Sequence, residues 1–151
     1  MPSNRTFKII GLFLLVTFLG ACSRVSEYNV LPAGQHKVQV RFTAKSLDGL
    51  GAQYTFSRQT GNNLPEQLGA GSARNNDTEV LDGGIRNSGD VIFVEISFRA
   101  ITPSSTVVPN PAASYAVEIL VDDVVQTKVV IDASSKINNT YYLAAVAKTT
   151  L

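Results

Sequence analysis

The chain has 151 residues, with 13 basic and 12 acidic side chains, one histidine and one cysteine. This length fits a single domain. A lone cysteine leaves no partner within the chain for a disulfide bond or a thiolate metal site. The charges nearly balance and no basic cluster stands out, so nucleic-acid binding has no electrostatic basis. We therefore expect no metal, no cofactor and no nucleic-acid partner.

Residues 1–21 have the layout of an export signal. Arg5 and Lys8 precede the apolar run Ile9–Leu19, which is shorter than the about 20 residues that a membrane-spanning helix needs. A basic start, a short apolar run and then small residues are typical of a secretory signal. The alternative is a buried N-terminal helix of the folded domain, but the run offers no polar face to solvent. We expect a signal helix that is cleaved from the mature protein.

The apolar run ends in Leu19-Gly20-Ala21-Cys22. This motif resembles the lipobox of bacterial lipoproteins, in which the cysteine thiol is acylated and the signal is cut just before it. The resemblance implies cleavage between Ala21 and Cys22, and lipidation of Cys22 by fatty acids of the palmitate kind. Several acyl chains hold a protein stably on a membrane. The alternative for Cys22 is a buried free thiol.

The same resemblance implies a location in the bacterial cell envelope. Ser23 rather than Asp follows the cysteine, and the sorting rule of the family then implies the outer membrane, facing the periplasm. Residues 22–35 form a polar, lipidated tether that contains Pro32 and Gly34. Residues 36–151 form the folded domain.

Apolar and polar residues alternate along most of this domain, which predicts half-buried strands. The alternating segments are Lys37–Ala44, Ala52–Ser57, Val91–Ile101, Tyr115–Val121 and Val124–Asp132.

Two polar stretches are predicted to be long loops. Thr60–Asn76 is rich in Gly and Asn, with room for a short irregular strand, and Thr102–Ala113 contains three prolines. Between them, Thr78–Leu81 is expected to form a brief strand that stops at a turn, Asp82-Gly83-Gly84. Tyr141–Lys148 is apolar on both faces, which predicts a buried final strand.

No segment after the signal has an apolar repeat of helical period. About six to seven strands joined by turns predict an all-β domain, an antiparallel β-sandwich of the Ig-like type. A small β-barrel is the alternative.

The hairpin around Asp122-Asp123 allows a prediction of strand register. A slip of one residue moves every side chain of a strand to the other face. A two-residue loop with regular pairing would set Ile119 opposite Gln126 and Val117 opposite Lys128. We expect a three-residue loop, or a β-bulge just after the turn, which gives the pairs Val121–Val125, Ile119–Thr127 and Val117–Val129 instead.

The segment Tyr115–Val125, followed by a final apolar strand, resembles the C-terminal half of the small Ig-like domains of the MmpS type. Those domains are membrane-tethered accessory proteins of envelope transporters. The chain departs from them because Asp122-Asp123 replaces the usual Asp-Gly turn and because it has no tryptophan. The resemblance implies the fold more than the function.

His36 is the sole histidine and precedes the first predicted strand. A Ser-His-Asp site would have to use it, with a carboxylate and a hydroxyl close by, and no Gly-x-Ser-x-Gly motif accompanies it. We expect His36 to be a solvated residue at a strand start. We expect no catalytic residue and no enzyme.

Other polar motifs have simpler interpretations. Adjacent Asp122 and Asp123 suit a turn better than an acid–base pair. Asn75–Asp77 with Glu79 lacks the spacing of a calcium loop, and Gly69–Ser72 lacks the lysine and the helix of a phosphate loop.

We therefore expect a membrane-anchored envelope lipoprotein that acts as a non-enzymatic structural or protein-interaction module, with another envelope protein as its partner. An exposed apolar patch on one sheet would favour this role. The alternative is a small-molecule or glycan-binding module that uses the loops 60–76 and 102–113, since long loops on a rigid scaffold often bind ligands. A concave pocket between those loops would favour it.

Overall fold

The computed structural model describes residues 30–101, 107–137, 140–141 and 144–151. The predicted signal and its cleavage site at Ala21 and Cys22 lie outside these ranges, as do tether residues 22–29 and loop residues 102–106. Within the described ranges, no helix is long and apolar enough to cross a membrane.

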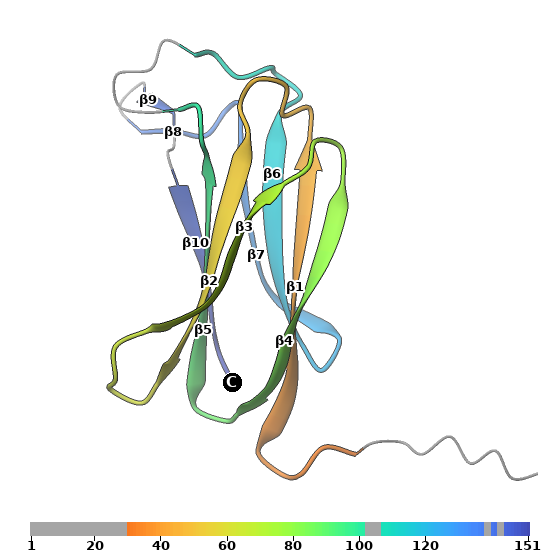
Figure 1. Ribbon diagram of the computed structural model, residues 1–151, viewed down its shortest axis with the longest axis vertical. Coiled ribbons are helices and arrows are strands. Elements are labelled where there is room, and N and C mark those ends of the chain that lie inside the picture. Colours follow the sequence, from red (N-terminus) through yellow and green to blue (C-terminus); the bar gives the residue numbers. More distant parts are fainter. Residues whose placement is uncertain (1–29, 102–106, 138–139, 142–143) are drawn as a thin grey trace, which may run out of the picture. The chain divides into compact units, whose positions relative to one another are not determined.

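The domain is an antiparallel β-sandwich of two four-stranded sheets (Figure 1). Sheet A has the strand order β4-β1-β6-β7, and sheet B has the order β10-β5-β2-β3. Neither sheet closes into a barrel, so the alternative fold is excluded. The strands of sheet A are β1 (Gln35–Lys45), β4 (Thr78–Asn87), β6 (Ser114–Val121) and β7 (Val124–Asp132). Those of sheet B are β2 (Ala52–Thr60), β3 (Glu66–Ala73), β5 (Asp90–Phe98) and β10 (Ala144–Thr150). A separate short hairpin pairs β8 (Lys136–Ile137) with β9 (Thr140–Tyr141).

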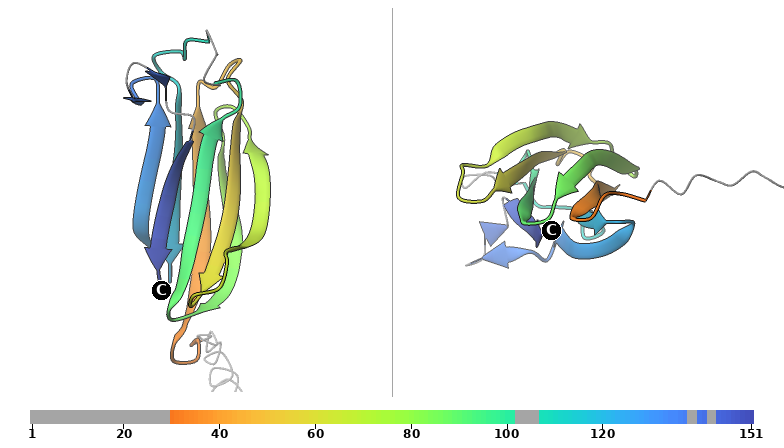
Figure 2. Two further views of the ribbon diagram at one scale, coloured as in Figure 1. Left: turned by 90° about the vertical axis from the view of Figure 1, so that its left-hand side faces the viewer. Right: turned by 90° about the horizontal axis from the view of Figure 1, so that it is seen from below.

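The two sheets face each other (Figure 2) and share one core, built from the alternating apolar positions of the strands. The rings of Phe42 and Tyr54 stack across the sheets with centroids 4.2 Å apart, and Tyr115 lies 6.2 Å from Phe42. On one side the edge strands β7 and β10 are joined by Thr127 Oγ1, which lies 2.6 Å from Thr149 Oγ1. The predicted all-β sandwich is confirmed, with eight strands in the sheets rather than about six to seven.

One of the additional strands, β3, lies in the predicted long loop of residues 60–76. The prediction left room there for only a short irregular strand, whereas β3 is an eight-residue edge strand made mostly of small or polar residues, with no apolar alternation to reveal it. Its glycine at Gly71 is needed for packing, since a Cβ there would come within 2.6 Å of the Tyr54 hydroxyl. In the second predicted loop, residues 107–113 are irregular, as expected.

Strand β4 continues through the predicted turn at Asp82-Gly83-Gly84. Val38 pairs with Gly84, whereas Gln39 pairs with Asp82, so Gly83 is an extra residue in a β-bulge. Gly84 has a φ of +73°, which a glycine adopts without strain. The glycines therefore bend the strand and do not end it.

The β6–β7 hairpin confirms the predicted bulge. Asp122 and Asp123 form a two-residue turn with φ values of 52° and 65°, as a type I′ turn requires. The register shifts between Ile119 and Leu120. The predicted pairs Ile119–Thr127 and Val117–Val129 are present, but Val121 pairs with Val124 and not with Val125.

The final strand differs from the prediction in position and in burial. β10 begins at Ala144 and lies at an edge of sheet B. Ala147 is fully buried, but Val146 is 54% exposed. Apolar residues on both faces predicted a buried strand, yet alanine and a single valine tolerate an exposed edge.

Candidate functional site

Three surface features of the sandwich combine side chains that could bind or react. Two lie at opposite ends. We call the end at which Gln35 begins β1 the proximal end, and the end at which β1 finishes, at Lys45, the distal end. The third feature is the outer face of sheet A.

At the proximal end, His36 bridges two turns. Its Nδ1 lies 2.8 Å from Asp122 Oδ2 in the β6–β7 turn, and its Nε2 lies 3.0 Å from Ser88 Oγ in the β4–β5 turn. An ionised carboxylate only accepts hydrogen bonds, so Nδ1 carries the proton and donates to Asp122. In the neutral imidazole, Nε2 then accepts from the Ser88 hydroxyl. His36 is therefore not merely solvated, as the sequence suggested, but holds two partners.

Both aspartates of the β6–β7 turn are tied to β1. Asp122 Oδ1 accepts the backbone N–H of Lys37 at 2.9 Å, and Asp123 Oδ1 accepts from Lys37 Nζ at 2.8 Å. The hydrogen bond from His36, with that of the Lys37 amide, holds the pKa of Asp122 below its usual range. The hydrogen bond to Asp123 raises the pKa of Lys37.

The backbone around Ser88 is fully engaged. The Ser88 N–H donates to the Gly34 carbonyl at 2.7 Å, and the Gly89 N–H donates to the Leu151 carbonyl at 2.8 Å. Gly89 has a φ of +88°, and a Cβ at this position would meet nothing within 4 Å. The Ser88 hydroxyl thus sits on an exposed turn with open space beside it.

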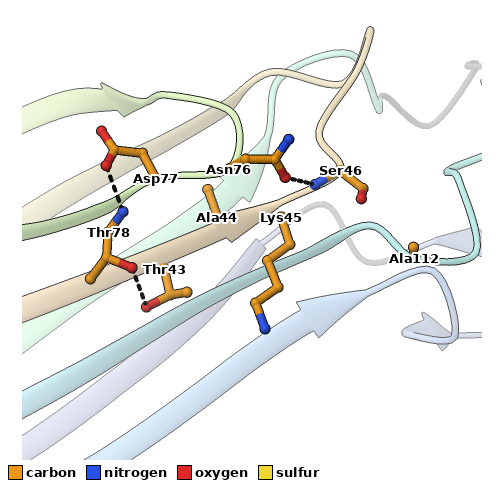
Figure 3. Close-up of a pocket in the computed structure, with 8 residues that line it drawn as sticks. All are labelled: Thr43, Ala44, Lys45, Ser46, Asn76, Asp77, Thr78 and Ala112. Carbon is orange, nitrogen blue, oxygen red and sulfur yellow. Dashed lines mark hydrogen bonds between the residues drawn. The ribbon is translucent and has the colours of Figure 1, made fainter.

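At the distal end, a shallow pocket of about 410 Å³ opens between the end of β1, the β3–β4 turn and the segment around Ala112 (Figure 3). The Asn76 side chain accepts the Ser46 N–H at 2.9 Å through Oδ1 and so fixes one wall. Ser46 and Asn76 both have positive φ values, of 49° and 54°. The remaining lining residues are Thr43, Ala44, Lys45, Asp77 and Thr78.

The chemistry of this pocket is polar. Within the described part of the chain, neither Lys45 nor Asp77 takes part in an ion pair. Asp77 Oδ1 accepts the N–H of Thr78 at 2.8 Å, and the Thr78 hydroxyl lies 3.5 Å from that of Thr43. The pocket can therefore offer an ammonium, a carboxylate and hydroxyls to a small ligand, but none of its lining residues is aromatic.

The outer face of sheet A has a charged row bordered by valines. Glu118 accepts from Arg41 Nη1 and from Lys128 Nζ, each at 2.9 Å. The hydrogen bond from Lys128, with help from Arg41, lowers the pKa of Glu118. Val80 lies beside Arg41 in the sheet.

Further exposed apolar residues continue this face. Val125 pairs with Leu120, which is itself buried, and Val130 pairs with Ala116. Val80, Val125 and Val130 are 53%, 44% and 42% exposed. We call the surface formed by Val80, Arg41, Glu118, Lys128, Val125 and Val130 the valine face.

The outer face of sheet B carries one exposed valine, Val146 on β10, and is otherwise more polar. Its central strand β2 presents the uncharged polar residues Gln53, Thr55, Ser57 and Gln59. The Lys148 ammonium lies 5.4 Å from the Phe93 ring and partly covers it.

The predicted site residues are distributed as follows. Cys22 and Ala21 lie outside the described residues, so the lipidation and cleavage sites stay predictions. Within the described residues, no three His, Cys, Asp or Glu side chains are placed to hold a metal ion. We call His36, Ser88 and Asp122 the proximal cluster. The sequence did not reveal it because Ser88 and Asp122 lie 52 and 86 residues from His36 along the chain.

Comparisons with known proteins add no functional information. No protein-family model matches the chain, and no curated protein and no solved structure matches it.

Proposed function

We propose that the chain is a lipoprotein of the bacterial cell envelope, anchored through a lipid on Cys22, whose β-sandwich binds another envelope protein through the valine face. The lipobox at Leu19–Cys22 supports the anchor, and Ser23 after the cysteine supports the outer-membrane location. The single observation that supports the binding role is the exposure of Val80, Val125 and Val130 around the Arg41–Glu118–Lys128 row.

The composition of this face favours a protein partner. Interfaces between proteins combine an apolar centre with arginine and hydrogen-bonded polar groups. Here Glu118 pairs with both Arg41 and Lys128, which leaves a net charge of +1, so a partner that supplies one carboxylate can cover the row without leaving a lone charge buried. The exposed valines then supply apolar area to the contact. Such a binding role requires no reacting group.

The anchor is tested by intact-protein mass spectrometry of the membrane fraction. We expect the mass of residues 22–151 plus lipid for the wild type, and an unlipidated, unprocessed or released chain for Cys22→Ala. A wild type without lipid would contradict the anchor, and the domain would then be exported freely.

The binding face is tested by placing a photoreactive amino acid at single positions in living cells. At Val80 and Val130 we expect a crosslink to the same partner protein. At Thr55, on the outer face of sheet B, we expect none. Equal crosslinking from both faces, or none from either valine, would rule the valine face out.

The distal pocket favours a second candidate, the binding of a small molecule or glycan. Asn76 ends the predicted loop 60–76 and Ala112 belongs to the loop 102–113, and both residues line the pocket. Lys45 would bind an anionic group of the ligand, such as the carboxylate of an acidic sugar. We expect an acidic disaccharide to raise the melting temperature of the wild type but not that of Lys45→Ala. Lys148→Ala, on the other sheet, should still respond.

A further inference from the structure

The proximal cluster has the connectivity of a proton relay. In such a relay a carboxylate orients a histidine through Nδ1–H, and Nε2 accepts the proton of a serine hydroxyl. The two contacts of His36, 2.8 Å to Asp122 and 3.0 Å to Ser88, are of this kind and involve the matching ring nitrogens. Both distances are within hydrogen-bond reach for general-base catalysis.

Two features hold this arrangement together. Asp122 is fixed by the Lys37 N–H as well as by His36, so its carboxylate cannot turn away. The Ser88 turn is fixed to the Gly34 carbonyl through its own N–H. The backbone thus holds the Asp122 carboxylate and the turn that carries Ser88 before any ligand arrives, as positioned catalysis requires.

We propose that Ser88 is a reactive serine, activated by His36 and oriented through Asp122, which cleaves carboxylic esters. This inference goes beyond the binding role of the valine face and concerns different residues. It also departs from the expectation from sequence that the chain has no catalytic residue, because the structure supplies the carboxylate and the hydroxyl that His36 lacked there.

The reaction would proceed in two balanced steps. His36 Nε2 takes the hydroxyl proton as Ser88 Oγ bonds to the ester carbonyl carbon. The bond to the leaving alcohol then breaks, and the alcohol takes up that proton. Water next attacks the acyl-serine with His36 again as the base, which releases the carboxylic acid and restores the Ser88 hydroxyl.

The surroundings of Ser88 set its substrate class and its speed. The open space beside Gly89 admits esters on small molecules or flexible chains. The Ser88 and Gly89 amides already donate to carbonyls, so neither is free to bind the developing oxyanion.

A single oxyanion donor is worth about 10²–10³ in kcat, so turnover here is slow and an activated probe is the better test. The full-length chain in detergent is treated with a fluorophosphonate, and adducts are counted by intact mass and mapped by peptide sequencing. In this reaction Ser88 Oγ bonds to phosphorus and hydrogen fluoride leaves. We expect one adduct, on Ser88, which is absent from Ser88→Ala.

Matched variants separate activation from folding. His36→Gln should slow labelling by about 100-fold or more, the usual range for a general base. Asp122→Asn should slow it by about tenfold or more, whereas Asp123→Asn, the neighbouring change in the same turn, should leave it unchanged. Asparagine tolerates the positive φ of both positions, so both variants keep the turn. No adduct on the folded wild type, or equal labelling of wild type and Asp122→Asn, would overturn the proposal.

Discussion

The two ends of the sandwich differ in their most prominent side-chain contacts. At the distal end, the stacked rings of Phe42, Tyr54 and Tyr115 fill the space between the sheets. At the proximal end, exposed polar groups tie turns to β1, with His36 between Ser88 and Asp122. Buried aromatic contacts are thus prominent at the distal end, and exposed hydrogen bonds between turns and β1 at the proximal end.

This difference matters because packing and exposed polar contacts contribute very differently to stability. A buried aromatic ring contributes several kcal/mol, about 3–5 when truncated to alanine. An exposed ion pair contributes about 0–1 kcal/mol. The proximal cluster therefore fixes geometry while adding little to the free energy of unfolding. Such a cluster can be altered for function without endangering the fold.

The largest predicted change in stability comes from a substitution at the distal end. Phe42→Ala should lower the free energy of unfolding by about 3–5 kcal/mol, because Phe42 is 1% exposed and contacts both other rings. At the proximal end, Ser88→Ala should change the free energy of unfolding by less than about 1.5 kcal/mol. Urea denaturation of both variants compares the two ends. If Ser88→Ala lowered the free energy of unfolding as much as Phe42→Ala, the exposed hydrogen bonds would stabilise the fold as much as the aromatic packing does.

The next largest change in stability is expected from Asn76, in the β3–β4 turn at the distal end. Asn76→Ala should cost about 1–2 kcal/mol, because it removes the hydrogen bond to the Ser46 N–H and forces alanine into a positive φ. Asn76→Gly is the matched control, since glycine keeps the backbone conformation and loses only the hydrogen bond. Thermal denaturation should rank the wild type first, Asn76→Gly second and Asn76→Ala last. Equal losses in the two variants would mean that the positive φ carries no strain.

The sequence predicted the strands that pack on the core better than it predicted the exposed edge strands. Strands such as β1 and β5 were predictable, because each packs one face on the core and alternation records this. In the edge strands β3 and β4 only Gly83 is buried, so the sequence predicted no regular strand at β3 and only the brief segment Thr78–Leu81 of β4. Local chemistry sufficed for the Asp122-Asp123 turn, which needs only two residues that tolerate positive φ.

The proximal cluster could not be predicted in this way. His36, Ser88 and Asp122 come together only because β1 lies between β4 and β6, which places two hairpin turns beside its first residues. That neighbour relation is a property of the whole sheet. The distal pocket depends likewise on the approach of the segment around Ala112 to the β3–β4 turn.

A smaller change, an increase in stability, is expected from a buried ring of the distal end. Tyr115 is fully buried, and its hydroxyl has no hydrogen-bond partner within the described residues. Burial also raises the pKa of the phenol. Tyr115→Phe removes a polar group without breaking a bond, so we expect a gain of up to about 1 kcal/mol in the free energy of unfolding. A loss measured by urea denaturation would indicate that an ordered water satisfies the hydroxyl.

The smallest predicted change in stability is at the proximal end, where the contribution of Asp122 depends on pH. The hydrogen bond from His36, together with that from the Lys37 amide, lowers the pKa of Asp122 from its ordinary value of 3.8. Folding then favours the ionised carboxylate, so its contribution is present above pH 3.8 and is lost as the pH falls through the lowered value. The stability difference between wild type and Asp122→Asn should therefore shrink between about pH 6 and about pH 3.

Urea denaturation at the two pH values measures this difference, and His36→Gln should reduce it because the hydrogen bond with the largest influence is then gone. A difference that grows on acidification would mean that the Asp122 pKa is raised rather than lowered. Because Asp122 is exposed on its turn, the effect is small compared with that of Phe42→Ala. The variants used to test Ser88 therefore stay folded near neutral pH, and a loss of labelling in Asp122→Asn reports on the relay itself.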